Sequence, residues 1–452
     1  MDAESQDQGM DCEPRKSIRY KLVRETKRVL NQIRSLGKPG RLSALVYTAP
    51  VGAQDRPLVV QPTGHNSPIG RRVLIMIGEA EGTFYNYQGR ALCRALENIG
   101  ANGYQLRTPR ALKIDQLPPE SILDAIHRYG ATDVMTINIP PAVALRGAPL
   151  PAGVLWHTWV QDLFDAGLHT PRAEGEVRWN WVKRWGEPYL LPATEHGRFY
   201  QDPDGYDVDV CFCGLYATEP LRLRGAPRKQ RRIGARIMRE VYALWEKDVF
   251  NYRTDWKQVH ELWTAAEERA GVKIGPSCLG ACLHHIACQA TRQSQRQRMA
   301  RAAVSICRKR KWRLALFGLN WESDFAAYAK GNLAPGFPLA RVFQRSKINI
   351  QLNGDTLFHN RLLEIFAAGG FGLSWVPGET DDEGLKIPLT DLKRFEADLE
   401  YWIGNEGQRR DEISRIGEQV RGHHTYEARM RKMLGLNTGD LAQAGIGASG
   451  RR

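Results

Sequence analysis

The stretch from Ser346 to Ser374 most constrains the fold, because it has the pattern of a buried strand, a turn and a helix in direct succession. The segment SKINIQL is β-branched and apolar enough for a buried parallel strand, and NGD is a turn signal. The segment HNRLLEIFAAGG predicts a helix that ends at glycine. Strand, turn and helix form half of a βαβ unit, so we expect an α/β protein.

The predicted helix carries an arginine and a glutamate near its amino-terminal end. Arg361 and Glu364 are three positions apart and therefore share one helix face. The free N–H groups at the start of a helix bind phosphate readily. A ligand with phosphates at one end and hydroxyls at the other, such as a sugar nucleotide, suits this pair. An ordinary salt bridge on a helix is the structural alternative.

Three ordered segments in the last third of the chain resemble the CgeB or YkvP type of glycosyltransferase-like proteins, relatives of the two-domain GT-B glycosyltransferases. The family's donor-binding pattern S-x-I-x-L-N, R-x-x-E and A-x-G is fitted, with small slippage in the strand, by Ser346, Ile350, Leu352, Asn353, Arg361, Glu364, Ala367 and Gly369. An upstream strand that ends in glycine and tryptophan is matched by Phe317, Gly318 and Trp321. The family's closing helix is matched by Arg410, Ile416, Gly417, His424, Thr425, Tyr426 and Arg429. Ordered matches are stronger than one short motif.

The resemblance implies a GT-B fold: two Rossmann-like domains face each other, the donor nucleotide binds to the C-terminal one, and a C-terminal helix crosses back. It also implies sugar transfer from a nucleotide-sugar donor without a metal or other cofactor, with Arg361 and a helix N-terminus stabilising the diphosphate. Glu364 takes the place of the glutamate that binds ribose hydroxyls.

Related GT-B enzymes often carry an earlier glutamate that faces the transferred sugar. Here Thr356 stands eight positions before Glu364, so the earlier glutamate is missing. The sugar contact then passes to Asn353, Asp355 or a backbone group. The loss also permits a catalytically silent binding protein that keeps the same fold.

The N-terminal half predicts a second α/β domain. RRVLIMIG is its first clear strand, and a glycine-containing loop and the helix ALCRALENIG follow. Gly78 and Gly82 do not form G-x-G-x-x-G, so a dinucleotide site is unsupported. The predicted divisions are a basic extension at 1–70, an acceptor-side domain at 71–205, a donor domain with the closing helix at 206–435, and a flexible tail at 436–452.

The acceptor of a GT-B protein lies mainly against the N-terminal domain, where loops at the carboxyl ends of strands supply catalytic groups. The catalytic candidates are Glu81, His157 and Asp162. A hydrogen-bonded structural role explains His157 equally well, and Asp162 also fits a helix cap. The residues expected to line the cleft are Gly82, Tyr85 and His196.

The donor domain opens with YDVDVCFCGLYATEP, a strand that runs into a glycine turn. Gly214 resembles the glycine that lets the backbone approach the donor diphosphate, and Tyr216 offers a hydroxyl. The complete donor-binding set is Gly214, Tyr216, Ser346, Asn353, Arg361 and Glu364.

The formal net charge of +14 is partly concentrated in residues 222–239 and 292–313. A basic face attracts polyanions. One interpretation is that these segments are solvated faces of amphipathic helices, whose Ile233, Ile237 and Ile306 enter the core. The alternative is a nucleic-acid track, in a DNA-modifying glycosyltransferase or in a nucleic-acid-binding protein.

No apolar run reaches membrane-spanning length and the N-terminus lacks a hydrophobic signal core, so we expect a cytoplasmic protein. The eight cysteines fit reduced, buried thiols. Cys278, Cys282, His285 and Cys288 fall on one helical arc, but their spacing matches no common metal site. We expect them in the core and predict no metal. The sequence does not specify the donor sugar, the stereochemistry, or whether the acceptor is a glycan, a protein or DNA.

Overall fold

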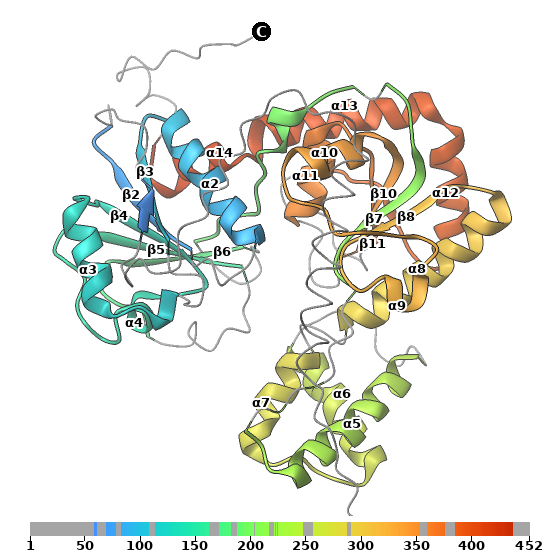
Figure 1. Cartoon of the computed structure of the whole chain (residues 1–452), viewed down its shortest axis with the longest axis horizontal. Coiled ribbons are helices and arrows are strands. Elements are labelled where there is room, and N and C mark those ends of the chain that lie inside the picture. Colours follow the sequence, from blue (N-terminus) through green and yellow to red (C-terminus); the bar gives the residue numbers. More distant parts are fainter. Residues whose placement is uncertain are drawn as a thin grey trace, which may run out of the picture. The chain divides into compact units, whose positions relative to one another are not determined.

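The computed structural model describes residues 58–60, 69–77, 83–107, 114–161, 171–181, 188–202, 204–216, 221, 223, 225–246, 256–286, 291–352, 359–375 and 385–436. These residues lie in the compact unit Arg56–Arg452. They form a mostly parallel sheet, a wholly parallel sheet, the helices of both sheets, and a helical insert (Figure 1). The predicted α/β class is therefore confirmed.

The first sheet has the strand order β1-β3-β2-β4-β5-β6. Its strands are β1 (Leu58–Val60), β2 (Arg72–Met76), β3 (Asn102–Arg107), β4 (Asp133–Ile137), β5 (Leu155–Val160) and β6 (Glu176–Asn180). All neighbours are parallel except the edge strand β1, which runs antiparallel to β3. The order reverses between β2 and β4, and open α/β sheets bind ligands at the carboxyl ends of the strands at such a point.

Helices contribute to a core on each side of this sheet. One core joins α2 (Thr83–Asn98) and α14 (Tyr426–Met433) to residues such as Val73 and Ile75. The other joins α3 (Pro119–Arg128) and α4 (Pro141–Ala144) to residues such as Leu74. Burial on both sides explains why β2 is apolar along nearly its whole length.

The second sheet is wholly parallel and has the order β12-β11-β10-β7-β8-β9. Its strands are β7 (Val208–Cys213), β8 (Leu314–Phe317), β9 (Ala329–Gly331), β10 (Ser346–Leu352), β11 (Gly372–Trp375) and β12 (Leu389–Thr390). This is the doubly wound Rossmann order, with its reversal between β7 and β10.

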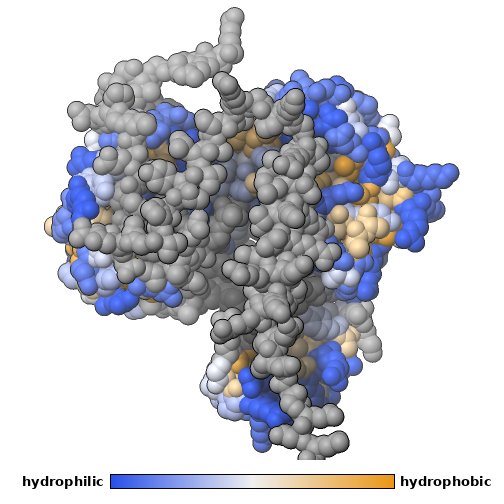
Figure 2. Space-filling view, in the orientation of Figure 1, coloured by the Kyte–Doolittle hydropathy of each residue, from blue (hydrophilic) through white to orange (hydrophobic). Residues whose placement is uncertain are grey.

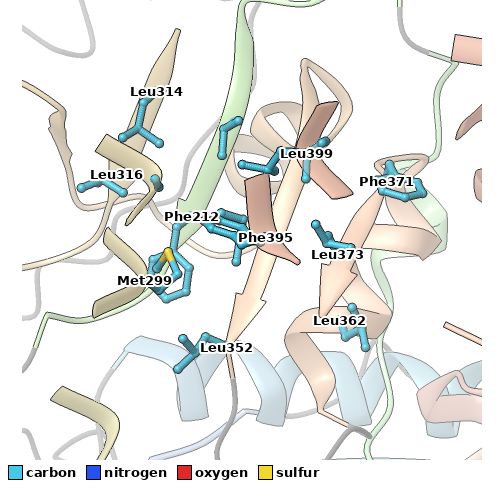
Figure 3. Packing of buried hydrophobic residues seen from close by; sticks show 14 of the residues in the cluster. Phe212, Met299, Leu314, Leu316, Leu352, Leu362, Phe371, Leu373, Phe395 and Leu399 are labelled. Atoms are coloured by element: carbon cyan, nitrogen blue, oxygen red, sulfur yellow. The ribbon is translucent and has the colours of Figure 1, made fainter. Parts of the chain in front are cut away.

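The helices associated with the second sheet are α8 (Thr291–Arg310), α9 (Glu322–Phe325), α10 (Phe337–Gln344), α11 (Asn360–Ala368), α12 (Phe395–Gly404) and α13 (Glu406–His423). In the main core, Phe212 of β7 lies close to Phe395 of α12 and Met299 of α8 (Figure 3). The predicted strand and helix are confirmed as β10 and α11. Gly369 ends α11 with φ 93°, in the left-handed conformation that glycine adopts readily.

A helical insert, defined here as residues 225–286, separates β7 from α8. It contains α5 (Arg228–Glu246), α6 (Trp256–Ala270) and α7 (Pro276–His285), which share a core of their own (Figure 1). Cys278 and Cys282 belong to this core, as expected, whereas Cys288 lies outside the described residues. Among the described residues, no group of three or more His, Cys, Asp or Glu side chains could hold a metal ion. Nor does any helix in the described part of the chain have the length and apolarity to cross a membrane.

Two segments join the parts that contain the sheets. The first, residues 188–207, contains the 3-10 helix η5 (His196–Phe199), and the second is the junction between α13 and α14. The segments pair through a parallel bridge between Thr194 and Thr425. Helix α13 contacts α11, whereas α14 contacts α2 of the first sheet. The predicted crossing of the C-terminal helix is therefore confirmed.

Candidate functional site

The strand reversal between β7 and β10 places a candidate crevice at the carboxyl ends of these strands. Helix α11 begins just beyond β10. His359 caps it, because its Nδ1 accepts a hydrogen bond from the Arg361 backbone N–H at 3.1 Å. The carboxyl end of β7 is followed by Gly214. This region therefore combines a helix N-terminus with a close-packed glycine turn.

Arg361 and Glu364 form a pair in which the carboxylate is buried and the guanidinium is half-buried, unlike an ordinary surface salt bridge. Arg361 Nη1 lies 3.3 Å from Glu364 Oε2, and the Glu364 side chain is only 4% exposed. Burial raises the pKa of Glu364 above its ordinary value, and the Arg361 charge opposes that shift. Glu364 Oε2 has no hydrogen-bond partner among the described residues. A buried acceptor that lacks a hydrogen-bond donor lowers the stability of the protein. This oxygen is therefore suited to accept a hydrogen bond from a hydroxyl group of a ligand.

His196 lies beside Glu364 although the two residues are far apart in sequence. Its Nδ1 is 4.0 Å from Glu364 Oε1 and 3.2 Å from Thr194 Oγ1. Burial, followed by the charge of Arg361, lowers the pKa of His196 to about 3, so the imidazole is neutral. The sequence predicts His196 in the cleft; in the structure it is buried against α11, in contact with the predicted donor glutamate.

His157 is a structural histidine and not a catalytic base. The Trp179 indole donates to His157 Nδ1 at 3.0 Å, so Nε2 carries the proton and donates to Asp133 at 2.9 Å. The side chain is 2% exposed. Both nitrogens are occupied, which corrects the catalytic assignment. Asp133 also binds Arg71 and Thr132, and these partners together with His157 hold its pKa below the ordinary value despite its burial.

Gly214 is held at the end of β7 by contacts from β8 and the segment that follows it. Its N–H donates to Phe317 O at 2.8 Å, and its carbonyl accepts from Trp321 Nε1 at 2.8 Å. A Cβ at Gly214 would lie 2.8 Å from the Phe212 ring. Packing against Phe212 therefore favours glycine at position 214, where the sequence predicts that the backbone approaches the donor diphosphate.

Two members of the predicted donor set do not face the crevice. Tyr216 is buried, stacks on Trp321 at 4.7 Å and donates its hydroxyl to Asp324, so it offers no free hydroxyl to a phosphate. Ser346 opens β10 at the end of the sheet opposite the crevice, and its hydroxyl donates to Val342 O at 2.7 Å. Both assignments are corrected: Tyr216 packs the core and Ser346 joins α10 to β10.

Several predicted residues lie outside the described part of the chain: Glu81, Gly82, Asp162 and Asn353. Tyr85 belongs to α2, but its side chain is also outside the described set. Their roles stay predictions.

The structure adds two aromatic residues that the sequence analysis missed. Trp181, just after β6, has its ring 5.5 Å from that of the α11 cap His359. Tyr87 of α2 is buried and lies 6.1 Å from the His196 ring. Burial and the nearby Glu195 raise the pKa of the Tyr87 phenol, so it stays protonated. Trp181 thus reaches the cap of α11 and Tyr87 reaches η5, and no local sequence pattern signals these contacts.

A cavity of about 690 Å³ lies where the two connecting segments meet. It is lined by Arg94, Glu97, Asn98, Glu195, Gly197, Arg198, Arg421, Thr425 and Glu427. Arg94 binds Glu195 through two nitrogens, with a shortest distance of 2.7 Å. None of the predicted site residues lines this cavity, so we do not place the donor there.

Part of the chain is similar to a sequence family, and most of the chain is distantly similar to solved structures. A family described as "Glycosyl transferase-like" matches residues 292–435, which is less than half of the chain. No curated protein matches the sequence. A solved glycosyltransferase from Rickettsia africae is similar, with 10% identity and a TM-score of 0.42 over 82% of this chain and 98% of that one. Sucrose-phosphate synthase from Thermosynechococcus elongatus has 13% identity and a TM-score of 0.42, over 84% of this chain and 100% of that one.

The neutral state of His196 predicts a loss of stability in acid. The folded pKa lies below the ordinary value of 6.5, so the unfolded chain binds more protons once the pH falls below about 6.5. The free energy of unfolding should then fall by up to about 1.4 kcal/mol per pH unit from this residue. Glu364, with a raised pKa, acts oppositely, since its contribution is lost as the pH rises through its folded pKa.

Substitution of His196 by glutamine removes the contribution of His196 to the pH dependence of stability and leaves that of Glu364. Between about pH 7 and pH 5, the free energy of unfolding of the wild type, measured in urea, should fall by roughly 2 kcal/mol more than that of His196→Gln. Replacing the exposed His127 with glutamine is the matched control and should leave the wild-type pH dependence unchanged. Equal pH dependence in His196→Gln and the wild type would show that His196 is not buried as a neutral group.

Proposed function

We propose that this protein is a GT-B glycosyltransferase of the CgeB or YkvP type that moves a sugar, of the hexose class, from a nucleotide-sugar donor to an acceptor. The match to the glycosyl transferase-like family over residues 292–435 supports sugar transfer. The observation that carries the site is the buried Glu364 of α11, whose Oε2 pairs with the Arg361 charge but accepts no hydrogen bond from the described residues. The donor nucleotide would bind at the carboxyl ends of β7 and β10.

The chemistry divides between the two ends of the donor. Glu364 accepts hydrogen bonds from the ribose hydroxyls, and Arg361 together with the positive N-terminal end of the α11 dipole stabilises the diphosphate as it leaves. No step in this scheme needs a divalent metal. Asn353 remains the candidate contact to the sugar, and Glu81 and Asp162 remain the candidate bases for the acceptor hydroxyl. His157 is not proposed for that role, because both of its ring nitrogens make hydrogen bonds within the protein.

Donor binding should depend on both Arg361 and Glu364. Glu364→Ala should weaken binding through the ribose and Arg361→Ala through the diphosphate, each by about tenfold or more, because hydrogen bonds to charged groups contribute roughly 1.5 to 3 kcal/mol. Calorimetric titration with the nucleotide diphosphate alone and with the complete sugar nucleotide measures both effects. A thermal-shift screen identifies the donor first, since a ligand at ~100 times its Kd stabilises the native state by about 2.7 kcal/mol.

A surface pair provides the control for this experiment. Glu406 and Arg410 on α13 form an exposed ion pair at 2.7 Å. Alanine at either position should leave donor affinity unchanged. Unchanged affinity in folded Glu364→Ala and Arg361→Ala would contradict the site assignment. Tight donor binding without hydrolysis or transfer to any acceptor would instead favour a catalytically silent binding protein.

A further inference from the structure

Helix α5 of the helical insert carries an unbroken basic face. Its exposed cations are Arg228, Lys229, Arg231, Arg232, Arg236 and Arg239. Four of them, at positions 228, 232, 236 and 239, follow the spacing that puts residues on one side of a helix, over about 16 Å. We call these four arginines the α5 stripe.

The opposite face of α5 is fixed in the protein interior. Ile237, Met238, Val241, Leu244 and Trp245 are buried in the core that α5 shares with α6 and α7. The orientation of the stripe toward solvent therefore follows from the packing of the insert. Hydrophilic residues cover much of the visible surface in the region of the insert (Figure 2).

The charges of the stripe are not balanced locally. No acidic residue occurs between Gly225 and Arg239, and no side chain of the stripe has an ion-pair partner among the described residues. By contrast, α13 balances Arg410 with Glu406, and the α8 cations Lys309 and Arg310 bind Glu396. The α5 stripe therefore differs from an ordinary solvated helix face, in which cations pair with neighbouring carboxylates.

The stripe also opposes the stability of its own helix. Arg228 and Lys229 stand in the first turn, where the helix dipole favours negative charge. Arginines four positions apart repel each other along the helix. A surface that breaks local rules without a structural compensation is a candidate for binding.

We propose that the α5 stripe binds the phosphodiester backbone of nucleic acid. Guanidinium groups bind phosphate through paired hydrogen bonds, and about 16 Å of duplex presents roughly ten phosphate charges. Protein interfaces are enriched in aromatic anchors, and membrane-binding helices insert an apolar face. The described part of the insert has no large exposed hydrophobic residue, and the apolar face of α5 is buried. The proposal does not rest on sugar transfer, because it concerns binding by the insert.

The test compares the wild type with the full-length variant R228Q/R232Q/R236Q/R239Q. Fluorescence anisotropy with labelled duplex DNA, single-stranded DNA and RNA measures affinity over a salt series. If the four arginines neutralise four phosphates, wild-type affinity for duplex falls on the order of 100-fold between roughly 50 and 200 mM salt. The variant should bind at least tenfold more weakly at the lowest salt, with a slope smaller by about 3 to 4.

A control variant with the same net charge as the stripe variant distinguishes the effect of the α5 stripe from the effect of the protein's overall charge. R128Q/K393Q/R394Q/R410Q removes four exposed cations elsewhere and should retain most of the wild-type affinity and salt dependence. Circular dichroism and urea unfolding confirm that both variants are folded. Equal loss in both variants, or no nucleic-acid binding by the wild type at low salt, would overturn the proposal. So would stripe-dependent retention on vesicles of anionic lipid without binding to nucleic acid.

Discussion

Arg429→Met should lower the free energy of unfolding by about 3 kcal/mol or more, because each buried acceptor that loses its donor costs roughly 1 to 3 kcal/mol. The Arg429 guanidinium donates to Leu191 O at 2.9 Å, Pro192 O at 3.1 Å and His423 O at 3.1 Å, and it lies 2.8 Å from His424 Nδ1. Methionine replaces the aliphatic part of the side chain but supplies none of these donors.

The position of Arg429 makes this loss larger than that of a surface arginine. The residue is 7% exposed, and it joins α14 to both segments that connect the two sheet-bearing parts. Urea unfolding monitored by tryptophan fluorescence gives the free energy and its denaturant slope. Arg128→Met is the control, since Arg128 makes only an exposed ion pair with Asp124 and should change stability by less than about 1 kcal/mol. An effect of Arg429→Met as small as that of the control would refute this role.

The local pattern was enough to predict β10 and α11. The strand is buried along nearly its whole length because the sheet is covered on both sides, and α11 ends at a glycine that can adopt positive φ. Such signals lie within a few residues of one another, so the sequence alone specifies them. The helical insert was not foreseen, because its core joins helices whose mutual packing leaves no short-range pattern.

The candidate site was predicted only in part, and the reason is geometric. Arg361 and Glu364 share one helix, so their spacing was sufficient to bring them together. The contact of His196 with Glu364 spans more than a hundred and fifty residues, and no periodicity encodes it. Ser346 was wrongly assigned to the donor site because it is the first residue of a parallel strand, whereas ligands bind at the opposite, carboxyl end of such strands. His157 was misplaced because the sequence does not show that Trp179 and Asp133 occupy both of its ring nitrogens.

Gly318→Ala should be the most disruptive small substitution near the crevice and should cost about 4 kcal/mol or more. Gly318 follows β8 with φ 132°, and a Cβ there would lie 2.0 Å from the carbonyl oxygen of Gly214. A backbone oxygen has no alternative rotamer, so the turn after β7 must move. That movement would also disturb the hydrogen bond from Trp321 to the same oxygen.

Gly205→Ala separates the steric clash from the backbone strain. Gly205 has a similar φ of 138°, but nothing lies within 4 Å of the Cβ position. Its replacement therefore reports only the cost of the unfavourable conformation, of order 1 to 3 kcal/mol. Stability from urea unfolding, together with donor binding, should be lowered more in Gly318→Ala than in Gly205→Ala. If the two alanine variants are equally stable and bind donor equally well, Gly318 and Gly214 do not make the close backbone contact that shapes the crevice.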